Sequence, residues 1–321
     1  MTKVLITGSN GFVGKALAEE LVTKSFNVNG AVRSLAPVNF PETISKFAIN
    51  DINSKTDWQK ALEDVDVVIH LAARVHIMKD AARDVLAEFR RVNVEGALNL
   101  ARQAERAGVR RFIFISSIQV HGEATLLGRP FTEADQPAPV DPYGISKREA
   151  EAALRQLARE TAMEVVIIRP PLIYGPGVKA NFQSMMRWLE KGAPLPLGAI
   201  HNRRSLVALE NLVNLIITCI HHQAAANQTF LVGDGEDLST TELLRRTAIA
   251  LGKTPRLVPV PVRVLMRGAC LLGKQAVAQR LCGSLQVDIS KARDLLGWTP
   301  LVSVDEALHK TAQHYMKSRK C

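Results

Sequence analysis

A glycine-rich turn between an apolar run and an amphipathic stretch constrains the fold of this chain most strongly. Val4, Leu5 and Ile6 form the run, and apolar residues recur at helical spacing from Phe12 to Leu21. Strand, glycine turn and helix in this order are typical of a cradle for phosphate groups, because backbone N–H groups at the start of the helix attract anions. The turn has GxxGxxG spacing, and we expect a dinucleotide to contact Gly8, Asn10, Gly11, Phe12, Val13 and Gly14.

The same alternation of short apolar runs and helical patterns continues for most of the chain. Helical patterns cover Asp84–Ala107 and Tyr143–Glu160, and further apolar runs are expected to be strands at residues 28–32, 47–49, 67–69, 112–115 and 165–168. Strands that are apolar at every position fit a parallel sheet covered on both faces. The sequence therefore predicts an α/β fold, a doubly wound parallel sheet of the Rossmann type.

The pattern breaks at Arg169-Pro170-Pro171 and gives way to loops rich in Gly and Pro. One further apolar run, Phe230–Val232, is expected to return to the sheet. We therefore predict a smaller, interleaved C-terminal α/β domain for the substrate. The predicted dinucleotide-binding domain comprises residues 1–169 and about 205–235, and the substrate domain comprises about 170–204 and 236–321.

The end of the second strand carries a cation where many dinucleotide-binding proteins carry an acid. No Asp or Glu lies between Glu20 and Glu42, and Arg33-Ser34 follows the strand. An arginine there can bind the 2′-phosphate of NADP, so NADP(H) is the expected cofactor and NAD(H) the alternative. After the third strand, Asp51-Ile52 is placed to contact the adenine ring.

A tyrosine and a lysine share one face of the helical pattern at 143–160. Tyr143 and Lys147 are four residues apart, and the lysine ammonium is expected to lower the pKa of the tyrosine. Ser116 and Ser117 end the strand at 112–115, at the edge of the sheet where ligands bind. Ser117 could bind a substrate oxygen, so Ser117, Tyr143 and Lys147 are the predicted catalytic residues.

These motifs, together with Asn93-Val94-Glu95-Gly96, resemble the extended short-chain dehydrogenase/reductase family, and within it the nucleotide-sugar epimerases, dehydratases and 4-reductases. The resemblance covers nearly the whole chain. It implies an NAD- or NADP-dependent enzyme with a nucleoside-diphosphate sugar as substrate, and it leaves a homodimer open. The sequence is most similar to bacterial UDP-glucose 4-epimerases and to UDP-4-keto-6-deoxy-N-acetylhexosamine 4-reductases of surface-polysaccharide synthesis.

The resemblance also implies roles for further residues. By position, additional cofactor contacts are Leu71, Ala72, Ala73, Asn93, Ser116 and Pro170, beside Tyr143 and Lys147 themselves. Asn181, Arg204 and Arg280 match positions that bind the nucleotide diphosphate. His121 stands where the family usually has a tyrosine, and it is a candidate substrate contact with Ser117 and Tyr143.

Two chemistries use this same set of residues. The leading expectation is NADP(H)-dependent reduction of a UDP-4-keto-(6-deoxy)-hexose at C4. The alternative is a UDP-hexose 4-epimerase with tightly bound NAD, which oxidises C4, turns the ketosugar over and reduces it again. A remote alternative is a catalytically silent dinucleotide-binding scaffold, whose relatives would be expected to lose Tyr143 or Lys147.

Charge and composition exclude other classes of partner. The formal charge is +10 (41 Lys and Arg against 31 Asp and Glu), but the cations are dispersed and only 5% of residues are aromatic, so we expect no nucleic-acid binding. The eight histidines form no HExxH and no cysteine–histidine cluster, so no metal site is expected. No signal peptide and no disulfide framework are evident, which predicts a cytoplasmic protein.

One segment, residues 262–283, has four cations, many apolar residues and no acid: its cations are Arg263, Arg267, Lys274 and Arg280. It is either a helix pair that touches a membrane surface or a segment that buries its apolar side in the small domain. We adopt the second interpretation, so membrane contact is not expected.

Overall fold

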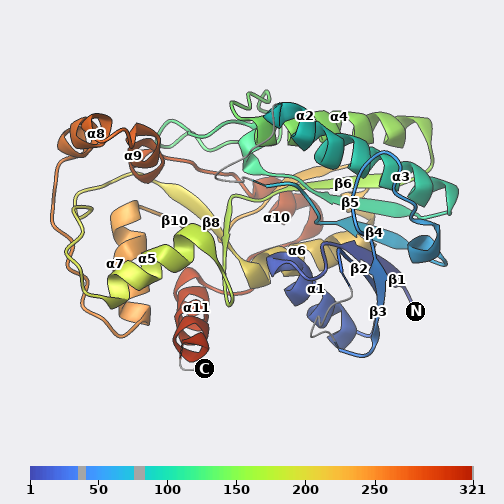
Figure 1. The fold of residues 1–321 in the computed structure, drawn as a ribbon, viewed down its shortest axis with the longest axis horizontal. Helices are drawn as coiled ribbons and strands as arrows, with labels where there is room; N and C mark the ends of the chain where they lie inside the picture. Colours follow the sequence, from blue (N-terminus) through green and yellow to red (C-terminus); the bar gives the residue numbers. More distant parts are fainter. Residues whose placement is uncertain (35–40, 76–83, 320–321) are drawn as a thin grey trace.

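A seven-stranded parallel sheet forms the centre of the computed structural model, which describes residues 1–34, 41–75 and 84–319. The strand order is β3-β2-β1-β4-β5-β6-β9 (Figure 1). The strands are β1 (Lys3–Thr7), β2 (Asn27–Val32), β3 (Ile44–Ala48), β4 (Val67–His70), β5 (Arg111–Ile115), β6 (Glu164–Arg169) and β9 (Thr229–Leu231). The predicted Rossmann-type fold and the return of the run at 230–232 to the sheet are confirmed.

The predicted third strand is displaced in sequence. Residues 47–49 were expected, whereas β3 begins at Ile44 and ends at Ala48. It is an edge strand that pairs only with β2 among the described strands. Its residues Ser45 and Lys46 are therefore exposed and polar, so the strand begins before the apolar run does.

Helices cover both faces of this sheet, as Figure 1 shows. On one face lie α1 (Phe12–Thr23), α6 (Leu209–His221) and α10 (Ser290–Leu296), whose apolar residues join one buried core. On the other face lie α2 (Val85–Arg90), η2 (Arg91–Gly96), α3 (Ala97–Arg106) and α4 (Pro142–Glu160), with η1 (Gln59–Leu62). The predicted helix 84–107 is thus interrupted by η2, which is wound as a π-helix.

A second, three-stranded sheet organises the smaller part of the chain. Its order is β10 (Asp237–Leu238), β8 (Arg204–Ala208) and β7 (Leu172–Tyr174), with β7 and β8 parallel and β10 antiparallel. The helices α5 (Ala180–Glu190), α7 (Thr240–Ala250) and α11 (Val304–Ser318) share an apolar core with it. Because β7 and β8 precede β9 in the chain, the small part is interleaved with the large one as predicted. The exact domain boundaries stay a prediction.

A buried carboxylate ties the two sheets together. Asp234 follows β9 and accepts hydrogen bonds from the Ala208 amide, the Asn211 side chain (both 2.7 Å) and the Tyr174 hydroxyl (2.9 Å). It therefore links β7, β8 and α6 to the end of the large sheet. The remaining elements are η3 (Ile118–Val120), η4 (Gln223–Ala225), α8 (Val262–Leu271) and α9 (Gln275–Cys282). No helix in the described ranges is long and apolar enough to cross a membrane.

Candidate active site

The glycine turn after β1 has the geometry of a ligand cradle. Gly8 has a φ of +67°, which favours glycine, and the Gly11 amide donates to the Gly8 carbonyl at 2.9 Å. A Cβ on Gly14 would lie 2.1 Å from the Gly8 carbonyl oxygen, so only glycine lets α1 approach the turn this closely. Gly11 is the N-cap and offers no side chain, which leaves the amide N–H groups that follow it facing outward. These features fit a pyrophosphate.

The other predicted cofactor contacts follow the neighbouring strands at the same edge of the sheet. Arg33 and Ser34 are exposed directly after β2. After β3, the Asp51 carboxylate accepts from the Ile52 amide and pairs with Arg91 at 2.6 Å, and bonds from Asn53 and Arg91 hold its pKa below the usual range. Because parallel strands end at one edge, these groups and the glycine turn lie at the same edge of the sheet.

The end of β4 is fixed by a neutral histidine. The ring of His70 lies 2.8 Å from the Thr7 hydroxyl, which also accepts from the Ala72 amide at 3.2 Å. Burial lowers the pKa of His70 to about 3, so the ring carries no charge at neutral pH. This bond positions the segment Leu71-Ala72-Ala73, which is half-buried beside Gly8.

Asn93 occupies the π-helical turn and holds two other parts of the site. Its side-chain amide donates to the Arg74 carbonyl and to the Ser146 hydroxyl (both 3.0 Å), and its oxygen accepts from the Arg74 amide at 2.8 Å. A π-turn adds a residue to the helix and is frequent at functional sites. Asn93 therefore joins the β4 edge to α4, the helix that carries Tyr143.

The structure brings Ser117, Tyr143 and Lys147 together. Ser117 follows β5 and is hydrogen-bonded to Tyr143. The Lys147 ammonium nitrogen lies 5.9 Å from the centre of the Tyr143 ring and donates to the Ile115 carbonyl at 2.8 Å. All three side chains thus meet where β5 ends.

The protonation states differ from the sequence expectation. Lys147 was expected to lower the pKa of Tyr143, but burial and the nearby Asp141 carboxylate raise it to about 12. Burial also lowers the pKa of Lys147 to about 7. Desolvation outweighs the pairwise attraction because neither charged form is surrounded by water in the free protein.

Two backbone contacts bring the ends of β5 and β6 together. The Ser116 amide donates to the Ile168 carbonyl at 2.8 Å, and the Ile118 amide donates to the Pro170 carbonyl at 3.0 Å. Ser116 and Pro170, both predicted cofactor contacts, are buried there.

A chain of buried charged residues lies behind Ser117, Tyr143 and Lys147, and the sequence analysis did not predict it. Arg169 at the end of β6 makes a bidentate ion pair with Glu151 (2.9 and 2.5 Å) and contacts the His121 ring at 2.6 Å. Burial and the arginine lower the pKa of His121 to about 4. The predicted substrate contact His121 thus faces Arg169 through Nε2 and stacks on Phe131. The sequence offered one signal: Glu151 follows Lys147 by four residues, which places both side chains on the same face of α4.

Two of the three predicted diphosphate contacts lie together. Arg204, at the start of β8, donates to the Arg280 and Gly283 carbonyls at 2.8 and 3.1 Å, and the Arg280 side chain pairs with Glu123 at 3.4 Å. Asn181, in the first turn of α5, instead lines a groove of about 1150 Å³ with Asn10, Gly11 and Phe12. Neither arginine lines that groove.

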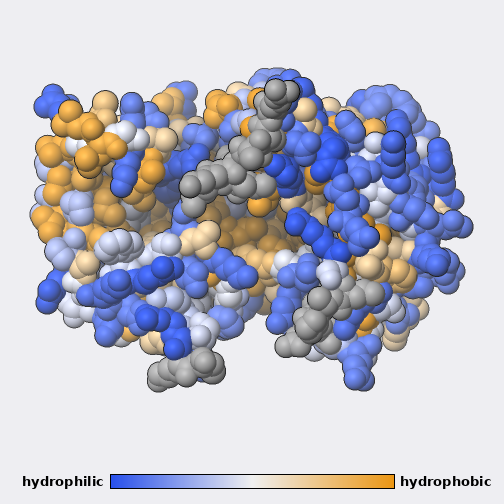
Figure 2. All heavy atoms as spheres, in the orientation of Figure 1, coloured by the Kyte–Doolittle hydropathy of each residue, from blue (hydrophilic) through white to orange (hydrophobic). Residues whose placement is uncertain are grey.

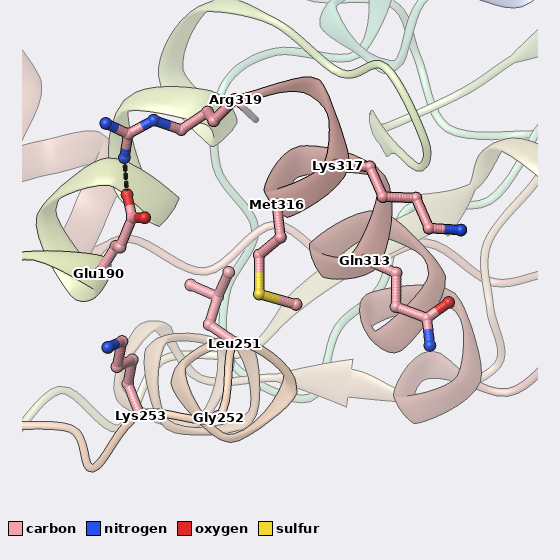
Figure 3. A pocket seen from close by; sticks show the side chains of 8 residues that line it. All are labelled: Glu190, Leu251, Gly252, Lys253, Gln313, Met316, Lys317 and Arg319. Atoms are coloured by element: carbon pink, nitrogen blue, oxygen red, sulfur yellow. Dashed lines mark hydrogen bonds and ion pairs between the residues drawn. The ribbon is translucent and has the colours of Figure 1, made fainter. Parts of the chain in front are cut away.

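A separate cavity of about 640 Å³ lies at the C-terminal end of α11 (Figure 3). None of its lining residues follows a strand of the large sheet, and the ion pair between Glu190 and Arg319 closes one side. It is lined by Glu190, Leu251, Gly252, Lys253, Gln313, Met316, Lys317 and Arg319. This cavity is not the candidate active site.

Comparisons with known proteins agree with the fold and the motifs. The NAD dependent epimerase/dehydratase family matches residues 4–233. A UDP-glucose 4-epimerase of Vibrio cholerae is 50% identical over 317 residues, which cover 98% of this chain and 96% of that protein. The chain belongs to the NAD dependent epimerase/dehydratase family, and the predicted membership in the extended short-chain dehydrogenase/reductase enzymes is confirmed.

Solved structures share the fold across the whole chain. A UDP-glucuronic acid 4-epimerase from Bacillus cereus in complex with NAD has a TM-score of 0.78 at 21% identity, covering 98% of this chain and 99% of that one. A UDP-glucose 4-epimerase with UDP-glucose from Thermotoga maritima has a TM-score of 0.78 at 23% identity, covering 99% and 100%.

Proposed function

We propose that this protein is a UDP-hexose 4-epimerase that retains NAD in the glycine cradle. The observation that carries the proposal is the 50% identity over 98% of the chain to a UDP-glucose 4-epimerase, with Ser117, Tyr143 and Lys147 all present and assembled. This favours the alternative considered from the sequence over the leading expectation of a 4-reductase. Both reactions need the same side chains, so the choice depends on whether the cofactor stays bound.

The residues present fit a dinucleotide. A Cβ would collide at Gly14 and would crowd Gly8 and Gly11, so the backbone surface of this turn stays open to a pyrophosphate. Bound there, NAD would supply the hydride acceptor and donor that oxidation and re-reduction of the sugar C4 require. Asn10, Phe12 and Val13 would line the cradle, and Asp51 and Ile52 would face the adenine. The 71–73 segment, Asn93, Ser116 and Pro170 would contact the rest of the cofactor.

Tyr143 would hold and move the proton at the sugar C4 oxygen. Its high pKa keeps the phenol protonated in the free protein, and the bond from Ser117 favours the phenolate form that accepts the proton from substrate. The charged form of Lys147 would favour that phenolate further. Ser117 would bind the same oxygen and fix its distance from Tyr143.

The two arginines near β8 supply positive charge for a nucleoside diphosphate. Arg204 is held by two carbonyl groups, so its guanidinium is preorganised. The Arg280–Glu123 pair is exposed, and a diphosphate would replace Glu123 as the partner of Arg280. Asn181 lies apart from them, in the groove beside the glycine turn, and would contact the substrate from there.

Cofactor retention tests this proposal directly. Purified protein is dialysed and denatured, and the released nucleotide is identified; NAD that survives dialysis is expected. UDP-glucose or UDP-galactose is then supplied without added cofactor, and interconversion is followed by chromatography. A protein that is empty after dialysis, and that consumes NADPH only with a UDP-4-keto sugar, would establish the reductase instead.

Arg33 provides a second test of the cofactor. If a 2′-phosphate binds there, Arg33→Asp weakens NADP binding about 10- to 100-fold, since a charge-assisted bond contributes about 1.5–3 kcal/mol. The epimerase proposal expects NAD affinity to exceed NADP affinity and to be insensitive to Arg33→Asp in calorimetric titrations of cofactor-stripped protein.

A further inference from the structure

The helices α8 and α9 form a hairpin at the outer end of the small lobe, the part of the molecule organised by the three-stranded sheet (Figure 1). They pack against each other, and the turn between them is Leu272-Gly273-Lys274. Gly273 has a φ of +66°, which permits the tight reversal. The hairpin therefore has a tip made by the end of α8 and this turn.

The hairpin does not bury its apolar side in the small lobe, so that expectation from the sequence is wrong. No residue of α8 is buried, and Ala278 is the single buried residue of α9. The tip residues Leu271 and Leu272 are 89% and 74% exposed, and Val264 and Val277 are each 56% exposed. Figure 2 shows hydrophobic atoms gathered at this end of the molecule. A cluster of exposed large aliphatic side chains marks an interaction surface.

The charges beside this apolar tip have one sign. Arg263, Arg267, Lys274 and Arg280 are exposed, and residues 262–283 contain no Asp or Glu. Within the described residues, Arg280 pairs with Glu123, and no ion pair is made by the other three cations. Arg267 and Lys274 flank the two leucines in sequence, so positive charge lies within about one helical turn of the tip on either side along the chain.

We propose that this hairpin docks the protein onto an anionic phospholipid surface. Leu271 and Leu272 would enter the boundary between headgroups and acyl chains, while Arg263, Arg267 and Lys274 would contact lipid phosphates. Apolar residues framed by cations are complementary to such a surface. A second copy of this chain is a poorer partner, because a twofold contact through the tip would oppose the same cations from each subunit.

The base of the hairpin is hydrogen-bonded to the candidate diphosphate site. The Asn202 side chain donates to the Leu281 and Gly283 carbonyls at 3.2 and 2.7 Å, and Arg204 donates to the Arg280 and Gly283 carbonyls. Docking of the hairpin would thus hold the candidate diphosphate site close to the bilayer. The proposal does not depend on which reaction the active site performs.

Vesicle flotation of the full chain tests the proposal. The vesicles contain either phosphatidylcholine alone or phosphatidylcholine with about 30% phosphatidylglycerol, at 0.1 M and at 1 M NaCl. We expect flotation with the anionic vesicles at 0.1 M salt and little at 1 M, where the Debye length falls from about 10 to about 3 Å. Absence of flotation with anionic vesicles at 0.1 M salt would overturn the proposal.

Paired variants separate the tip from general surface effects. Leu271→Ser/Leu272→Ser should weaken the vesicle partition coefficient by about 10-fold or more, since two exposed leucines supply the inserting surface. Arg263→Gln/Arg267→Gln/Lys274→Gln should abolish the preference for anionic lipid. Ile249→Ser/Leu301→Ser removes two exposed apolar side chains elsewhere (64% and 65% exposed) and should leave partition unchanged.

Two further measurements test whether each variant is folded and whether the hairpin is a dimer interface. Circular dichroism and the melting temperature establish that each variant is folded. Sedimentation velocity without lipid tests the competing occupant: a wild-type dimer that the leucine variant converts to monomer would assign the hairpin to a subunit interface and overturn lipid docking. Equal flotation of the wild type and the leucine variant would overturn it as well.

Discussion

Gly144 lies where α4 packs closely against the Ser117 segment, so Gly144→Ala is expected to displace the proposed catalytic residue Tyr143 and impair catalysis without unfolding the protein. Gly144 lies in the first turn of α4, next to Tyr143, and its amide bonds the Asp141 carboxylate at 2.7 Å. An added Cβ would lie 2.7 Å from the Gln119 carbonyl oxygen and 3.1 Å from a Pro139 carbon. Gln119 belongs to η3, directly after Ser117 and Ile118. The substitution therefore pushes the Tyr143 segment away from the Ser117 segment.

The magnitude follows from this geometry. Ordinary contact begins at 3.4 Å, so the two segments must separate by about 0.7 Å (3.4 minus 2.7 Å). A misplacement near 1 Å can cost about 100-fold in rate, so kcat should fall by about 10- to 100-fold. The free energy of unfolding should fall by at most about 3 kcal/mol, because overpacking costs about 1–3 kcal/mol and alanine offsets up to about 1 kcal/mol of this over glycine in a helix.

The assay is the initial rate of UDP-glucose to UDP-galactose conversion, measured with the melting temperature and the amount of retained cofactor. Gly268→Ala is the matched control, because Gly268 also lies in a helix and a Cβ there would meet nothing within 4 Å. A Gly144→Ala enzyme with unchanged kcat would refute the argument that this contact sets the Ser117–Tyr143 geometry.

Three further substitutions test the site. Tyr143→Phe should lower kcat at least about 100-fold with cofactor retention unchanged, because positioned proton transfer contributes that much; an active variant would remove Tyr143 from the proton transfer. Arg204→Ala should raise the substrate KM about 10-fold or more, as expected for a charge-assisted phosphate contact, and an unchanged KM would place the diphosphate elsewhere. Glu151→Gln should destabilise the protein by about 3–5 kcal/mol at neutral pH, because Arg169 loses its buried partner. The ion pair lowers the pKa of Glu151, so its stabilisation is present above about pH 4.5 and is lost as pH falls through the lower folded pKa. Chemical denaturation at several pH values should therefore show the wild-type advantage shrinking in acid, and a difference independent of pH would contradict it.

Local periodicity and local spacing were enough to predict much of this protein from its sequence. Runs such as 67–69 and 112–115 are apolar at every position because their strands are covered on both faces, and this pattern is visible without any partner. The glycine turn was equally clear, since Gly14 is required by contacts within seven residues of chain. Tyr143 and Lys147 share a helix face by their spacing alone.

Only the tertiary structure decided the features that depend on burial and on distant residues. Glu151, Arg169 and His121 meet because α4, β6 and the segment after β5 converge, and no local pattern encodes that contact. The pKa of Tyr143 rises instead of falling because the fold removes water from it, which the spacing to Lys147 does not reveal. The hairpin at 262–283 shows the same limit: its apolar pattern is compatible with burial or exposure, and packing alone leaves Leu271 and Leu272 in solvent. The periodicity of apolar residues specifies which side chains share one face of a helix or strand, whereas the neighbouring elements determine whether that face is buried.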